Sequence, residues 1–313
     1  MNLNIEPLMD AINRYLAKAD EDLEEQLADE GFVAPSIAVT AIDEIEEAVA
    51  TALNANTDEL LESLAKSADI DDFIEKVWPT IKDVETLESV LKEGFRKQFN
   101  DLFRQCTYEW IARQDEELAV AITDARITKP AENFIKSWSN DLAGIMKLNT
   151  NQQIENILLK AAEEKHTIAQ VEDAIANSSI RNVGYRSRRV AVTEVLRVES
   201  YSQLESMRQN PSAYKKVWRW NDVGQEPRAN HQEINGQEVF KRDTFTLGPY
   251  SPLCPRDTSL PASETVNCHC TMDVIQDKQV LGMTTEERLA LRNKYMDEVD
   301  KEYEDIVAAS KGA

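Results

Sequence analysis

The segment VNCHC, residues 266–270, holds two of the chain's four cysteines. In an extended segment, side chains at positions i and i+2 share one face, so we expect Cys268 and Cys270 to point together. His231 precedes them in a predicted turn, and Cys254 lies in a proline-rich loop between the two. Three thiolates and one imidazole are a reasonable ligand set for structural zinc. The sequence therefore predicts a zinc site made of His231, Cys254, Cys268 and Cys270.

Two other interpretations of these residues stay open. In the first, the thiols are simply buried and His231 is hydrogen-bonded within its turn, since C-x-C is less diagnostic of zinc than C-x2-C. In the second, Asp222, Arg228, His231 and Glu233 form the site of a metal-dependent nuclease or hydrolase. No nucleophile–base pair or phosphate-binding loop is recognisable nearby. We therefore expect a structural pair or cap for Asp222 and Arg228, and no catalytic residues.

The elements before this region are predicted to be helical. A long amphipathic stretch covers residues 83–125, and a polar break at 147–153 precedes another helix that Thr150 is expected to cap. A further helix is predicted over residues 178–210, where Asn210-Pro211 ends it. Within that helix, Glu194 and Arg197 are three positions apart and are expected to pair.

From Lys215 onward the pattern changes to short strands, turns and proline-rich loops. Six of the 10 prolines lie between Pro211 and Pro261. The expected elements are a strand in KVWRWND, a helical turn in RANHQEI, a tight turn at Asn235-Gly236, a strand in QEVF, a strand in TVNCHCTMDVI and a charged helix that a capping box at Thr284–Glu287 begins.

These elements predict an α+β chain: a mainly helical N-terminal region, then a small α+β module with a short antiparallel sheet and long proline-rich loops. We expect a helical, acidic region over residues 1–147, the module over 148–280 and a charged helix over 281–313. No apolar run reaches membrane-spanning length, and the first residues lack the pattern of a secretion signal. We therefore expect a soluble protein, synthesised in the cytoplasm, with reduced cysteines.

Charge is distributed unevenly along the chain. The formal net charge is −22, and residues 1–80 hold 20 acidic and 4 basic side chains. Residues 181–219 instead hold 9 basic and 3 acidic side chains. The acidic part suits a protein partner with a basic surface, whereas the basic part allows only weak, salt-sensitive, nonspecific contact with DNA. The candidate DNA-contacting residues are Arg186, Arg188, Arg189 and Arg197.

Taken in order, these motifs resemble the phage Mu F-like head-morphogenesis family of minor capsid proteins. The resemblance covers roughly residues 149–275. The matching positions are Ala191, Thr193, Glu194 and Arg197 in a helix, then Trp220, Asp222, Arg228, His231, Gly236, Asn267, Cys268 and Cys270. The chain departs from the family pattern at His269, where a basic residue, often arginine, is usual. Cys254 is not part of that pattern.

The resemblance implies a minor capsid protein of a tailed phage or prophage that acts in head assembly, DNA packaging or genome delivery. Its location would be the virion, in the capsid interior or at the portal vertex, after assembly in the host cytoplasm. Its partners would be the portal protein, a scaffold protein or the major capsid protein. Some members of the family carry a C-terminal toxin domain beyond the shared module. A stand-alone DNA-binding adaptor is a third interpretation, beside the minor capsid protein and the nuclease or hydrolase.

Overall fold

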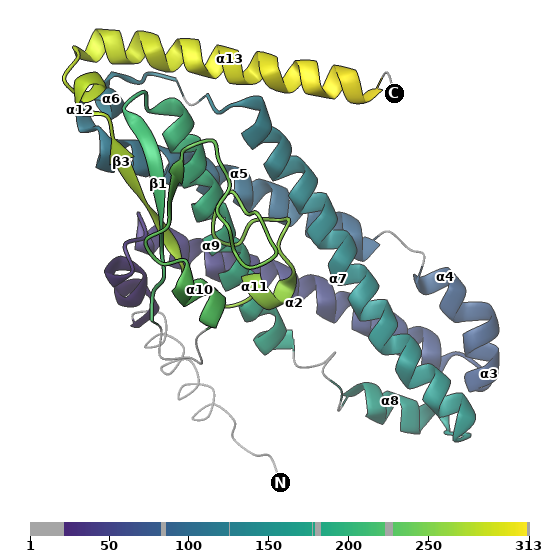
Figure 1. Ribbon diagram of the computed structural model, residues 1–313. Coiled ribbons are helices and arrows are strands. Elements are labelled where there is room, and N and C mark those ends of the chain that lie inside the picture. The colour runs from purple at the N-terminus through teal and green to yellow at the C-terminus, as the bar shows by residue number, and fades with distance from the viewer. Residues whose placement is uncertain are drawn as a thin grey trace. The chain divides into compact units, whose positions relative to one another are not determined.

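The computed structural model describes residues 22–82, 86–124, 126–176, 178, 183–222 and 228–311. Its elements run α2 (Pro35–Ala65), α3 (Ile70–Asp72), the π-helical turn η1 (Phe73–Val77), α4 (Trp78–Lys82), α5 (Thr86–Gln114), α6 (Glu116–Ala121), α7 (Lys129–Glu163), α8 (Ile168–Ala176), α9 (Val183–Gln209), β1 (Ala213–Arg219), α10 (Ala229–Glu233), β2 (Glu238–Phe240), α11 (Ala262–Thr265), β3 (Thr271–Gln276), α12 (Lys278–Leu281) and α13 (Thr285–Lys311) (Figure 1). This arrangement confirms the predicted fold class.

The three strands form one antiparallel sheet in the order β2-β1-β3. Lys216 in the central strand lies opposite Val239 on one side and Val274 on the other. The predicted Asn235-Gly236 turn is present: Gly236 has a φ of +84°, and its N–H donates to the Trp218 carbonyl over 2.8 Å. Glycine is favoured at such a φ because it has no Cβ to clash with the backbone.

The chain divides into two compact units, each built from separate segments. Unit 1 comprises the chain up to Ile42, Asp101–Ala131 and the chain from Thr193 onward, and unit 2 comprises Asp43–Asn100 and Glu132–Val192. The boundary expected near residue 147 lies inside α7. Because α2, α5, α7 and α9 each continue from one unit into the other, no division by linear sequence reproduces these units.

In unit 1, α9 packs against the sheet and its loops (Figure 1). Leu204 and Met207 of α9 share a buried core with Trp218 of β1 and Met272 of β3. The Gln203 side-chain amide also donates to the Met272 carbonyl over 2.7 Å. Burial of these apolar side chains is the main force holding the module on its helix.

Unit 2 has an apolar core of its own. It joins α2, α3, η1, α4, α7 and α8 through a set of side chains that are at most 5% exposed: Leu60, Leu64, Ile70, Phe73, Trp78, Ile154, Leu158, Ala161, Val171 and Ile175. The Trp78 indole N–H donates to Glu155 at the edge of this core over 3.2 Å.

Several local predictions were wrong, each for a physical reason. The stretch 147–153 does not end a helix: the Thr150 hydroxyl is buried and donates to the Met146 carbonyl one turn earlier, so it caps nothing. The expected helix 83–125 is divided into α5 and α6, with Asp115 capping α6 by accepting from the Leu118 N–H.

The capping box of α13 is confirmed by reciprocal hydrogen bonds between Thr284 and Glu287.

Within the part of the chain that the structure describes, every helix is too short or too polar to cross a lipid bilayer.

Candidate functional site

His231, Cys268 and Cys270 form a buried cluster within unit 1. The Nδ1 atom of His231 lies 3.4 Å from the Cys270 Sγ and 3.7 Å from the Cys268 Sγ. The three side chains are 2 to 3% exposed, and their candidate ligand atoms all lie within 4.8 Å of one another. Two sulfurs and one imidazole nitrogen that converge in this way could hold a metal ion.

The local backbone explains how these side chains meet. His231 lies on the short helix α10, and the cysteines follow α11, which ends before Asn267 adopts a φ of +53°. Asparagine tolerates this left-handed conformation better than most residues. VNCHC therefore begins in a turn and precedes the strand, which begins at Thr271 rather than within the motif. The expected alternation holds, because both cysteines reach His231 while His269 contacts Glu30.

Glu264 fixes the orientation of the His231 ring. Its Oε2 atom lies 2.9 Å from the His231 Nε2 and also accepts from the Asn230 side-chain amide over 3.1 Å. A carboxylate can only accept, so Nε2 carries the proton and the lone pair of Nδ1 faces the two thiols. A carboxylate behind a ligating histidine is a common outer partner of metal sites.

The two thiols differ in acidity. The hydrogen bond from the Cys270 thiol lowers the pKa of Cys268 well below its ordinary value, and the same contact raises the pKa of Cys270. The nearby Arg256 guanidinium also lowers the pKa of Cys268. Cys268 is therefore the first of the pair to become a thiolate, which is the form that binds metals.

Arg256 links the cysteine segment to α9, a role that no sequence pattern predicted. Its guanidinium is fully buried and donates to the Cys268 carbonyl over 2.5 Å and to the Ser200 hydroxyl over 2.6 Å. Its own carbonyl accepts from Arg197, whose guanidinium pairs with Glu194 over 2.8 Å. The expected Glu194–Arg197 pair is thus present, and it is buried rather than exposed.

Other residues of the motif hold the surrounding loops. Arg228 donates to the carbonyls of Ser263 and Val266, each over 2.6 Å, and so fastens both ends of α11. The Trp220 N–H donates to the Asn235 side chain over 3.1 Å. Thr193 is buried on α9.

Three predicted site residues lie apart from the cluster. Cys254 is buried in the same apolar core but is not within ligand distance of the other three, because its loop carries it towards Lys216 and Asp257. Asp222 and Glu233 are exposed, and Glu264 is the carboxylate that contacts His231. Sequence reasoning missed Glu264 because it is 33 positions from His231.

The candidate DNA-contacting arginines are largely occupied. Arg197 is buried against Glu194, and in unit 2 the Arg188 guanidinium lies 2.7 Å from Asp43 and 3.1 Å from Glu46. Arg189 is exposed. The Arg186 side chain lies outside the described residues. Arg188 and Arg197 are therefore engaged by carboxylates.

Comparisons with known proteins gave two relatives. The chain is 28% identical over 302 residues to the uncharacterized protein YqbB of Bacillus subtilis, a match that spans 92% of this chain and 97% of YqbB. It is 29% identical over 160 residues to the NAD(+)–arginine ADP-ribosyltransferase EFV of Enterococcus faecalis, which spans 50% of this chain but 31% of that protein. No protein-family model and no solved structure matches the chain.

Proposed function

We propose that this chain is a minor head protein of a tailed phage or prophage, located in the capsid interior or at the portal vertex. The observation that carries the proposal is the burial of the motif residues and the contacts that they make. Glu194, Arg197, His231, Cys268 and Cys270 are all buried. Arg197, paired with Glu194, fastens the proline-rich loop to α9 through the Arg256 carbonyl, and the other three hold α10 to the cysteine segment. Such an arrangement suits a structural component better than an open catalytic site.

The match to the Enterococcus protein is compatible with this proposal. Some members of the Mu F-like family, which this chain resembles, carry a toxin domain beyond the shared module. The matched segment occupies 31% of that ADP-ribosyltransferase, as expected if the similarity concerns a shared module and not the enzyme as a whole.

We also propose that His231, Cys268 and Cys270 bind a structural zinc ion. Thiolate and imidazole are the ligands that zinc prefers, and Glu264 already holds the histidine with Nδ1 towards the sulfurs. Within the described chain the cluster supplies three ligands, so a tetrahedral ion takes its fourth from outside it. The ion would join α10 to the cysteine segment, where no regular hydrogen-bond ladder connects them.

Quantitative mass spectrometry of purified procapsids and mature virions tests the head-protein proposal. We expect a few to some tens of copies per particle, and fewer when Cys268→Ser and Cys270→Ser are combined. Cys254→Ser is the matched control, because it alters a buried thiol of the same core outside the cluster. Absence of the protein from both kinds of particle would contradict the proposal, and assays for metal-dependent nuclease activity would follow.

A further inference from the structure

A cavity of about 580 Å³ lies in unit 1, separate from the cysteine cluster. Its walls come from the end of α9, the start of β1, the segment after β2, and α13. They include Leu204, Met207, Tyr214, Lys241, Tyr295 and Ile306. This volume is within the range of sites that bind small molecules or inserted side chains, and the lining combines apolar groups with a few polar ones.

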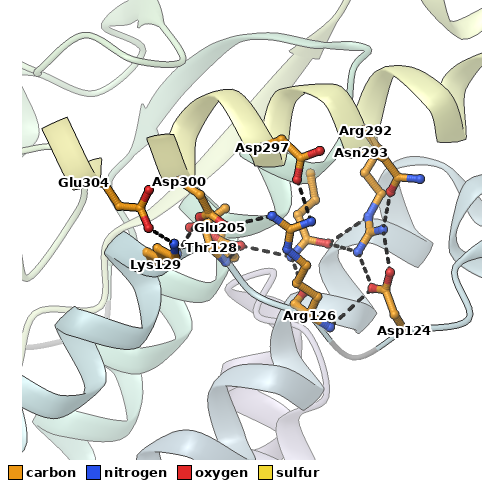
Figure 2. A network of polar contacts seen from close by, with 11 residues as sticks. Asp124, Arg126, Thr128, Lys129, Glu205, Arg292, Asn293, Asp297, Asp300 and Glu304 are labelled. Carbon is orange, nitrogen blue, oxygen red and sulfur yellow. Dashed lines mark hydrogen bonds and ion pairs between the residues drawn. The ribbon is translucent and has the colours of Figure 1, made fainter. Parts of the chain in front are cut away.

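The wall formed by α13 is held in place by a polar network (Figure 2). Arg292 is buried and contacts Asp124 and Gln209, each over 2.8 Å. Further along the helix, Asp300 accepts from the guanidinium of Arg126 and from the N–H of Lys129 over 2.7 Å each. The cavity therefore has a fixed wall, not one formed by a loosely attached helix.

Among the described residues that line the cavity, Lys241 is the cation without an acidic partner. Its ammonium group donates to the Met207 carbonyl over 3.1 Å and to the Asn210 carbonyl over 3.4 Å, and it lies 5.4 Å from the centre of the Tyr295 ring. No carboxylate of the described chain pairs with it. An ammonium group has three donors, so at least one remains for an incoming acceptor.

The other two cations of the lining are already paired. Arg208 lies 3.4 Å from Glu205, and Arg242 lies 3.5 Å from Glu302. Burial lowers the pKa of Lys241 to about 8, because its two carbonyl acceptors and the Tyr295 ring offset only part of the hydration that the charged form loses. A carboxylate that enters the cavity would offset the rest.

Apolar surface continues beyond the cavity. Tyr214 is 48% exposed and packs edge-to-face against Phe240, which is 49% exposed, with ring centres 5.3 Å apart. Ile306 on the α13 wall is 62% exposed. A small molecule of the cavity's size would leave Phe240, which does not line the cavity, in water, whereas a polypeptide segment would cover it together with Tyr214 and Ile306.

We propose that this surface binds a segment of another protein, which inserts an apolar side chain into the cavity and places a carboxylate against Lys241. The carboxylate belongs to an acidic residue beside the apolar one or to a chain end. The inference extends beyond the head-protein proposal and does not depend on it, because the surface is present in unit 1 whatever particle the chain joins.

Site-specific photo-cross-linking in native host cells tests this inference. The photoreactive residue p-benzoylphenylalanine is placed at position 214 and, as a control, at Val120 on α6, which is 76% exposed and does not line the cavity. We expect position 214 to capture a peptide with a carboxylate near an apolar residue. Lys241→Met should lower the yield about tenfold, since a charge-assisted hydrogen bond is lost.

Lys294→Met is the matched control, because Lys294 is an exposed lysine of α13 that pairs with Glu298; it should leave the yield unchanged. Ile306→Asp, at an exposed position, should reduce the cross-link without affecting folding. The inference is overturned if position 214 captures no more than position 120, if the captured molecule is a lipid, a nucleic acid or another copy of this chain, or if neither variant lowers the yield. Cross-linking is measured in whole cells, whereas the head-protein proposal is tested by mass spectrometry of purified particles. A negative cross-linking result is therefore distinguishable from absence of the chain from particles.

Discussion

Glu199 is a fully buried acid on α9 in unit 1. Its carboxyl accepts from the Trp110 indole over 3.2 Å and from the Cys106 thiol over 3.6 Å. Burial raises the pKa of Glu199 from 4.5 to about 8, because the charged form loses its hydration. In the unfolded chain the same group titrates near its ordinary value.

We predict that this carboxyl makes stability fall with rising pH. Since the folded-state pKa is the higher one, its contribution is complete below about pH 4.5 and is lost as the pH rises to about 8. The loss is on the order of 5 kcal/mol. Denaturant unfolding of the wild type and of Glu199→Gln at several pH values measures it. The variant should lack this slope, whereas Glu302→Gln, at an exposed position, should keep it; equal slopes in all three proteins would contradict the prediction.

A second prediction concerns the two thiols beside His231. A strong zinc chelator should lower the melting temperature of the wild type, and added zinc should restore it, because a structural ion contributes several kcal/mol to folding. The Cys268→Ser variant should melt at a lower temperature and no longer respond to the chelator. Cys254→Ser should keep the response. A wild-type protein that contains no zinc and is indifferent to the chelator would exclude the zinc proposal.

The core of this candidate site was predictable from residue type and spacing, but its supports were not. His231, Cys268 and Cys270 are rare residues, and the C-x-C spacing places both thiols on one face. An arginine in a proline-rich loop is usually expected at the surface, and only the folded chain shows that Arg256 is buried. Long-range contacts through irregular loops leave no periodic signal.

At the scale of elements, the sequence predicted types better than boundaries. The strands, the turn at Gly236 and the capping box of α13 follow from local chemistry and are present. The prediction of a break at the polar stretch 147–153 was wrong, because polar residues on the outer face of a long helix resemble a helix end. Thr150 shows the ambiguity, since its hydroxyl can cap a helix or bond back to the preceding turn.

We predict that Arg292 determines how firmly α13 is attached. Arg292→Met should destabilise unit 1 by about 1 to 3 kcal/mol, because it leaves the buried Gln209 oxygen without its donor. Arg242→Met, which removes an exposed pair with Glu302, should cost less than about 1 kcal/mol. Hydrogen exchange of the α13 amides, together with thermal unfolding, measures both. Equal effects of the two substitutions would show that the buried contacts contribute no more than the surface pair.

At the scale of the whole molecule, each of the two units is discontinuous in sequence. The linear division that we expected follows composition: acidic helices first, then a proline-rich module, then a charged helix. Contacts follow a different order, since Glu30 meets His269 across 239 positions. Composition carries no information about such pairing, so the arrangement into units could not be obtained from the sequence.

The discontinuity of unit 1 has a consequence for synthesis on the ribosome. Unit 2 has all of its segments once Val192 has been made, whereas unit 1 still lacks its sheet and the cysteine cluster. Leu27, Phe32 and Val33, which are buried in the finished protein, are therefore translated long before the sheet that completes their unit. A ribosome stalled between the codons for Val192 and His269 would hold a nascent chain with one finished unit and an exposed apolar segment, a natural substrate for chaperones.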